Sequence, residues 1–139
     1  MGMLKSDPDR KGYLLDTHAF LWAVHETEHL GKNALRVLES ATSELYLSTI
    51  TAFEVTTKYR IGKLDEYYYV VDNYTEIIRK LGAVELPVTL AHAYQAGQME
   101  WEDRDPFDRI LVAQAALENL TLVTQDAMLA AHPWIETIW

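Results

Sequence analysis

The chain contains no cysteine, carries few basic residues and has no long hydrophobic run. The absence of cysteine excludes disulfides, thiolate catalysis and Cys-based zinc sites, so any metal would have to be held by Asp, Glu or His. The 12 Lys and Arg residues against 21 Asp and Glu leave a net charge of −9. This balance argues against broad, nonspecific binding to nucleic acid, because such affinity comes from basic side chains that neutralise phosphates.

The apolar stretches are short. They fall below the roughly 20 residues that a membrane-spanning helix needs, and the start MGMLKSDPDRK lacks the apolar segment of a signal peptide. We therefore expect a cytoplasmic protein with no membrane partner. The 139 residues, 49% of them hydrophobic, suffice for one domain with its own core. We expect a flexible lead over residues 1–11 and a single domain over residues 12–139.

Short apolar strands alternate with helical segments along the chain. We expect strands at 12–16, 44–49, 83–87, 120–124 and 135–139, the last one short. Among the helices between them, one spans 50–62 and a long one spans 67–82 and ends at Gly82. Short, mostly apolar strands are typical of a sheet covered on both faces. The pattern predicts a three-layer α/β/α sandwich with a central, mostly parallel sheet of four to five strands.

Four carboxylates stand where strands give way to helices: Asp16, Glu54, Asp108 and Asp126. In a parallel sheet the carboxyl ends of the strands share one edge, and the following helices begin there. Residues that are distant in the sequence can therefore converge in one crevice.

Helix capping is the alternative explanation for each acid taken singly. Asp is a favoured N-cap, and acids in a first turn gain from the helix dipole. Asp105, followed by proline, fits an N-cap and would place Asp108 at the third helical position. Thr51 and Glu54 have the spacing of a capping box, and Glu54 and Lys58 that of an i,i+4 ion pair.

Taken together, the acids point to a metal. Carboxylates gathered at one sheet edge repel one another, which raises their pKa values unless a cation lies among them. A set of oxygen ligands suits Mg²⁺ or Mn²⁺ better than zinc. Such an ion polarises a phosphoryl oxygen and activates a water, so phosphodiester hydrolysis is the chemistry that this arrangement favours.

Several segments, in this order, carry a family resemblance: LLDTH, STITAFEVTTKYRIGKL, RDPFDRILVAQAAL and LVTQDAML. The chain from Tyr13 to Trp139 resembles PIN-domain ribonucleases, most closely the VapC-type toxins of bacterial toxin–antitoxin systems. The resemblance implies the PIN fold and a metal-dependent endoribonuclease. Such an enzyme acts as the toxin of a type II pair and hydrolyses RNA phosphodiester bonds with a metal-activated water.

The resemblance also assigns residues. It implies that the catalytic, metal-holding acids are Asp16, Glu54, Asp108 and Asp126. Asp105 matches a frequently acidic neighbour that could add a ligand. Residues that support the site or contact the substrate are Thr17, Thr124 and Arg109. Mg²⁺ or Mn²⁺ is the implied cofactor, RNA the substrate, and a small cognate antitoxin and a second copy of the chain the partners.

Two positions depart from the family pattern. Asp103 stands where close relatives often have histidine, and Phe53 where they often have tryptophan. Asp103 adds negative charge near the expected path of RNA. Together with the net charge, it supports an alternative interpretation, a PIN-fold interaction module that is catalytically weak or silent.

Two further features have competing interpretations. The stretch from His25 to His29 satisfies the zinc-protease pattern H-E-x-x-H, yet the Leu-Gly that follows indicates a helix end or an exposed connection. Lys58, Arg60 and Lys63 form the densest basic group. They are either a solvated face near a helix C-terminus or a contact for RNA phosphates or an acidic partner.

Overall fold

The computed structural model describes residues 11–139, and its centre is a five-stranded sheet with the order β3-β2-β1-β4-β5. The strands are β1 (Lys11–Leu15), β2 (Ser43–Ser48), β3 (Val84–Leu86), β4 (Thr121–Val123) and β5 (Thr137–Ile138). Every pairing is parallel, with Tyr13 opposite Leu45 on one side and Thr121 on the other. The predicted sheet is confirmed. The lead predicted over residues 1–11 is one residue too long, because β1 begins at Lys11, and its remainder lies outside the described residues.

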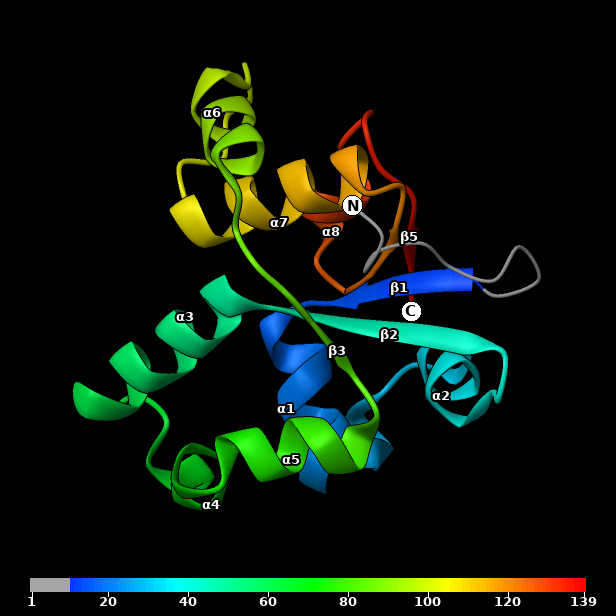
Figure 1. The fold of residues 1–139 in the computed structure, drawn as a ribbon, viewed down its shortest axis with the longest axis vertical. Coiled ribbons are helices and arrows are strands. Elements are labelled where there is room, and N and C mark those ends of the chain that lie inside the picture. Colours follow the sequence, from blue (N-terminus) through cyan, green and yellow to red (C-terminus); the bar gives the residue numbers. More distant parts are fainter. Residues whose placement is uncertain (1–10) are drawn as a thin grey trace.

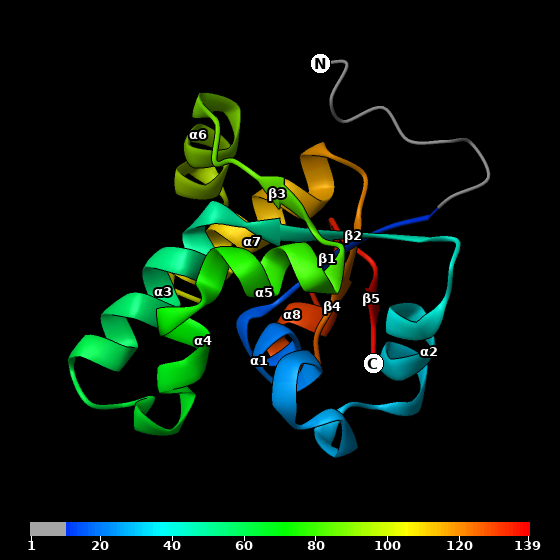
Figure 2. The same ribbon diagram turned by 60° about the horizontal axis from the view of Figure 1, so that its bottom comes forward.

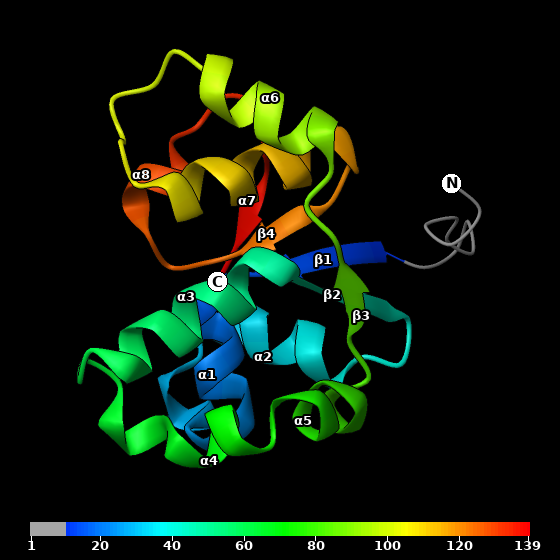
Figure 3. The ribbon, with the colours of Figure 1, turned by 60° about the vertical axis from the view of Figure 1, so that its left-hand side comes forward.

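Helices cover both faces of this sheet (Figures 1 and 3). They are α1 (Thr17–His25), α2 (Lys32–Glu39), α3 (Thr49–Arg60), α4 (Tyr68–Asp72), α5 (Tyr74–Leu81), α6 (Leu90–Gln98), α7 (Pro106–Leu117) and α8 (Ala127–Ala130). Short 3₁₀ turns lie at Thr27–His29 and Asp65–Tyr67. The first five helices form one layer and the last three form the other, which gives the predicted α/β/α sandwich. Within residues 11–139, no helix combines the length and apolarity needed to cross a membrane.

The core divides into two clusters because side chains alternate across the strands. Leu14 packs in the cluster that contains α6, α7 and α8, whereas Leu15 packs in the cluster that contains α1 to α5. Tyr46 and Leu47 of β2 divide in the same way. Leu14 and Leu15 are fully buried, and burial of such a side chain contributes about 1.5–3 kcal/mol. Because helices pack against both faces of the sheet, the residues that follow its strands are held at well-defined positions along its edge.

The single helix predicted over residues 67–82 is two helices. The break lies at Asn73, whose φ of −125° and ψ of 29° are not helical. Its side-chain amide donates a hydrogen bond to the carbonyl of Tyr69 at 2.9 Å. The backbone N–H of Asn73 donates to the same carbonyl at 3.1 Å, and local side-chain bonds of this kind favour non-helical conformations at Asn. Gly82 ends α5 as predicted, with a φ of 73° that favours glycine.

The end of the chain closes the structure at the sheet edge. Figure 2 shows β5 and the C-terminus beside α2. The backbone N–H of Asn33 donates to the carbonyl of Trp139 at 3.2 Å. The short terminal strand predicted from the sequence is therefore present, and the β4 edge is covered.

Candidate active site

The four predicted acids line one cleft of about 410 Å³. Asp16 follows the last residue of β1, and Asp126 lies three residues beyond β4. Because β1 and β4 are parallel neighbours, both positions lie at the same edge of the sheet. Glu54 and Asp108 reach the cleft from the two helical layers, on α3 and α7. The convergence expected from the sequence is therefore found.

Helix capping also operates at this edge, and it does not compete with the cleft. Asp16 Oδ1 accepts the N–H of Ala19 at 2.7 Å, and Asp126 Oδ1 accepts the N–H of Met128 at 2.8 Å. Asp105 caps α7 and accepts the N–H of Phe107 at 2.9 Å, as predicted. Each cap uses Oδ1, so a capping aspartate is held firmly while its other oxygen can serve a second contact.

Asp108 is at the third position of α7, as predicted. Burial, a hydrogen bond with Asp103 and the negative charges of Asp105, Asp103 and Asp126 together raise the pKa of its carboxyl to about 8, and burial contributes most. Without a cation, this carboxyl therefore keeps its proton at neutral pH. Asp103, which the sequence left without a role, is the hydrogen-bond partner of a site acid.

Asp16 is tied to Asp126 through Thr124. Burial raises the pKa of the Asp16 carboxyl, while hydrogen bonds from the Thr124 hydroxyl and from the N–H of Ala19 act in the opposite direction. The Thr124 side-chain oxygen also accepts the backbone N–H of Asp126 at 3.1 Å. Thr124, itself buried, thus links two acids of the cleft.

Glu54 caps nothing. The N-cap of α3 is Ser48, whose side chain accepts the N–H of Ile50 at 3.1 Å, so the capping box suggested by Thr51 and Glu54 is wrong. Thr51 lies within the helix, because α3 begins at Thr49, one residue before the predicted start. The position of Glu54 therefore has no explanation in helix capping.

Glu54 is instead buried, with 7% of its surface exposed, and both of its carboxylate oxygens have partners. Oε1 accepts the hydroxyl of Thr17 at 2.5 Å, and Oε2 accepts the ammonium of Lys58 at 2.6 Å. The i,i+4 ion pair predicted from the sequence is present. Thr17 comes from α1 and Lys58 from α3, so two helices hold this one carboxylate.

Arg109 faces the loop between α6 and α7, and it is not among the residues that line the cleft. Its guanidinium donates to the carbonyls of Ala96 at 3.0 Å, Trp101 at 3.1 Å and Asp103 at 2.8 Å, and also to that of Met99. This geometry favours a supporting role over substrate contact, because the guanidinium is committed to the backbone of the segment that carries Asp103 and Asp105.

The donor set suits a hard divalent cation, although the arrangement is not closed around one. Among residues 11–139, no group of three or more His, Asp or Glu side chains could hold a metal ion as it stands. The cleft nevertheless supplies only carboxylates as charged oxygen ligands, the type that Mg²⁺ and Mn²⁺ prefer. Burial, and to a lesser extent neighbouring carboxylates, raise the pKa values of Asp16 and Asp108, and a cation in the cleft would favour their charged forms.

The zinc-protease pattern forms no site. Helix α1 ends at His25, so the two histidines do not share the face of one helix. The ring of His25 packs against Tyr69 with 5.3 Å between centroids, whereas His29 Nε2 lies 3.1 Å from Glu26 Oε2. Neither histidine lines the acidic cleft.

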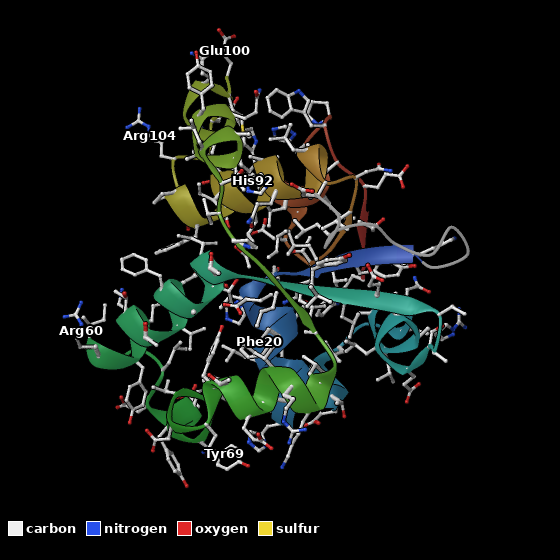
Figure 4. The ribbon with its side chains drawn as sticks, in the orientation of Figure 1. Phe20, Arg60, Tyr69, His92, Glu100 and Arg104 are labelled. Atoms are coloured by element: carbon white, nitrogen blue, oxygen red, sulfur yellow. The ribbon has the colours of Figure 1, made fainter. Side chains whose placement is uncertain are left out.

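The basic group divides in space. Lys58 bonds to Glu54, whereas Arg60 projects away from the protein in Figure 4, as Arg104 does on the α6–α7 loop.

Two residues that sequence reasoning did not assign to the site, His18 and Gln125, also line the cleft. Their adjacency to Asp16 and Asp126 was the available signal.

Comparisons with known proteins agree with this geometry. The model of the PIN domain family matches residues 13–135. No curated protein gives a significant match. Solved structures with a similar fold include VapBC2 of Rickettsia felis bound to a DNA fragment from its promoter. That match has 17% identity and a TM-score of 0.64, and it covers 92% of this chain and 98% of the other.

Two further structures are similar to the same degree. A toxin–antitoxin complex from Klebsiella pneumoniae has 19% identity and a TM-score of 0.63, with coverage of 91% of this chain and 96% of the other. FitAcB from Neisseria gonorrhoeae has 19% identity and a TM-score of 0.65, with the same coverage of 91% and 96%. At such identity these structures bear on the fold alone, but the family model spans nearly all of the described residues. The chain belongs to the PIN domain family.

Proposed function

We propose that the protein is a metal-dependent endoribonuclease, which hydrolyses RNA phosphodiester bonds and acts as the toxin of a type II toxin–antitoxin pair. The observation that carries this proposal is the convergence of four carboxylates from four segments in one cleft. Capping accounts for Asp16 and Asp126, but it does not account for Glu54, which is buried inside α3. Burial of a charged group is costly, and the contacts of Glu54 with Thr17 and Lys58 offset this cost while its carboxylate lines the cleft.

The residues that would hold Mg²⁺ or Mn²⁺ are Asp16, Glu54, Asp108 and Asp126, with Asp105 as a further acidic neighbour. A divalent cation bound there would polarise a phosphoryl oxygen and lower the pKa of a water. The hydroxyl of Thr17 keeps the Glu54 carboxylate oriented toward the cleft, and Thr124 does the same for Asp16. Arg109 supports the site indirectly, through the loop before α7.

RNA as the substrate rests on the resemblance to PIN-domain ribonucleases. The acids repel a phosphodiester, so the substrate can approach only when a cation faces it. The net charge of −9 favours recognition of a short single-stranded segment at the cleft over wide contact with a duplex backbone.

The partners follow from the same resemblance. The structural neighbours named above include toxin–antitoxin complexes, which supports a small antitoxin as a partner. Exposed apolar side chains support a second copy of the chain: Leu90 at 85%, Tyr94 at 64% and Phe53 at 60% exposure. Purification from the native host, with mapping of RNA ends after induction, would identify the antitoxin and the substrate together. The mass of the purified complex would give the number of copies of this chain that it contains.

The proposed chemistry is tested by removing single charges from the cleft. We expect Asp16→Asn and Asp108→Asn each to reduce RNA cleavage at least about 100-fold, because each removes a ligand rather than an outer contact. EDTA should abolish cleavage by the unsubstituted protein. Asp72→Asn is the matched control, since Asp72 is exposed on α4, outside the cleft. Undiminished cleavage in both cleft variants, with folding confirmed by circular dichroism, contradicts the proposed mechanism.

A PIN-fold interaction module without useful catalysis is the second candidate. Two observations favour it: the overall negative charge, and the absence, among residues 11–139, of a group of acids already closed around a metal position. Calorimetry with Mn²⁺ separates the two candidates. No Mn²⁺ binding, together with no growth arrest on expression, favours the module, whereas binding and arrest favour the nuclease.

A further inference from the structure

The ammonium of Lys58 contacts the carboxylate of Glu54, which is one of the proposed metal ligands. This ammonium is 2.6 Å from Glu54 Oε2, while the hydroxyl of Thr17 takes Oε1. Glu54 therefore has no oxygen without a protein partner in this state. The bond to Lys58 is the one that a divalent cation must replace or share, because the Thr17 hydroxyl carries no charge.

This ion pair differs from an ordinary pair on a helix surface. The side chain of Glu54 is 9% exposed and that of Lys58 is 35% exposed. The pair of Glu76 and Arg79 on α5 provides the comparison, with exposures of 49% and 71%. Charges that are withdrawn from water are screened less, so the ammonium acts on the cleft more strongly than a surface lysine would.

Lys58 also contributes to the charge balance of the metal-free cleft. The donors suit a hard cation, yet no group of three or more described acids or histidines could hold one as it stands. The ammonium of Lys58 already neutralises the charge of Glu54 and contacts one of its two carboxylate oxygens. The lysine is thus the resident counter-ion of the metal-free site.

We propose that Lys58 competes with the divalent cation for Glu54 and thereby sets the metal concentration at which the site loads. This inference rests on the proposed metal-dependent function. Lys58 is a positioning residue in this account, because it acts on the metal through Glu54. Thr17 holds the same carboxylate from the other side, so Glu54 keeps its place when the ammonium leaves.

The test is Mn²⁺ binding, measured by calorimetry on the full chain at low ionic strength and without RNA. We expect Lys58→Met to bind Mn²⁺ roughly tenfold more tightly or better, because it removes a cation that competes for and repels the metal at close range. Lys58→Arg keeps the positive charge, so its Mn²⁺ affinity should stay close to that of the unsubstituted protein. Arg60→Met removes from the same helix a charge that projects into solvent. We therefore expect its Mn²⁺ affinity to change less than about threefold.

The outcomes separate this inference from the proposed function. If neither the unsubstituted protein nor any variant binds Mn²⁺, both fail. If the unsubstituted protein binds Mn²⁺ and Lys58→Met binds equally or more weakly, competition is excluded and Lys58 serves only to hold Glu54. Circular dichroism checks the fold of each variant, and Lys58→Gln, which keeps a polar group, gives a second measurement if Lys58→Met does not fold.

Discussion

At the scale of single residues, the most informative pair in the cleft is Asp103 and Asp108. The two carboxyls share a hydrogen bond, and Asp103 Oδ1 also accepts the backbone N–H of Asp105 at 2.8 Å. Asp103 therefore shapes the turn before α7 and at the same time keeps a proton on a site acid. A histidine at this position would not add this negative charge. A cation that entered the cleft would therefore have to displace this proton.

The raised pKa of Asp108 makes stability depend on pH. Its value of about 8 in the folded protein lies above the ordinary 3.8, so the folded state keeps a proton that the unfolded state releases. Between about pH 4 and pH 8 the contribution of Asp108 to the stability of the metal-free protein therefore falls as pH rises, and above about pH 8 it is constant. We expect Asp108→Asn to abolish this pH-dependent loss of stability. The loss is roughly 2 kcal/mol, a value reduced because Asp108 is partly exposed.

The measurement is urea unfolding in EDTA at about pH 5 and about pH 8. The quantity of interest is the difference between the unsubstituted protein and Asp108→Asn, which cancels the titration of other groups. Asp103→Asn should reduce the pH dependence in part, because it removes one of the charges that raise the pKa of Asp108. A difference that does not change with pH would falsify the assignment.

At the scale of elements, the loop between α6 and α7 is held by one side chain. Arg109 offers its donors to the carbonyls of Ala96, Met99, Trp101 and Asp103, in a fork that lysine cannot reproduce. Phosphate recognition is the usual use of such a fork, but here its partners are backbone groups. The first turn of α7, which carries Asp108, is therefore fixed relative to the end of α6.

Replacing Arg109 should increase the mobility of the loop between α6 and α7 more than that of the sheet. We expect Arg109→Met to destabilise the protein by about 2–3 kcal/mol, because it leaves part-buried carbonyls without donors. Hydrogen exchange should accelerate over residues 99–105 and stay slow in β1. Arg104→Met is the control on the same loop, since Arg104 is exposed and projects outward. Equal acceleration throughout the chain would show a global rather than a local role.

At the scale of the whole molecule, the charge limits how the proposed RNA substrate could bind. With a net charge of −9, few phosphates can be neutralised, so we expect its affinity to depend on the cleft and the proposed cation. We expect binding of a non-hydrolysable single-stranded oligoribonucleotide in Mn²⁺ to weaken with salt at a log–log slope shallower than about −2. Fluorescence anisotropy at several salt concentrations measures this slope. A slope of about −4 or steeper would indicate a broad basic surface and contradict the expectation.

The sequence alone determined the features that depend on near neighbours along the chain. Short, mostly apolar runs marked the strands, and Asp105 with the proline after it marked the start of α7. The acids could be placed at one edge because parallel strands always present their carboxyl ends together. The same reasoning failed at Asn73, where the side-chain amide bonds to the Tyr69 carbonyl and the backbone leaves the helical conformation.

The tertiary structure decided which of these local features act on one another. The spacing of Glu54 and Lys58 predicted an ion pair, but only the packing of α1 and α3 buries it and brings Thr17 to the same carboxylate. The role of Arg109 and the bond between Asp103 and Asp108 likewise depend on how the α6–α7 loop folds back. Burial and contacts between distant segments set the charge balance of the cleft, because both depend on packing that no local pattern encodes.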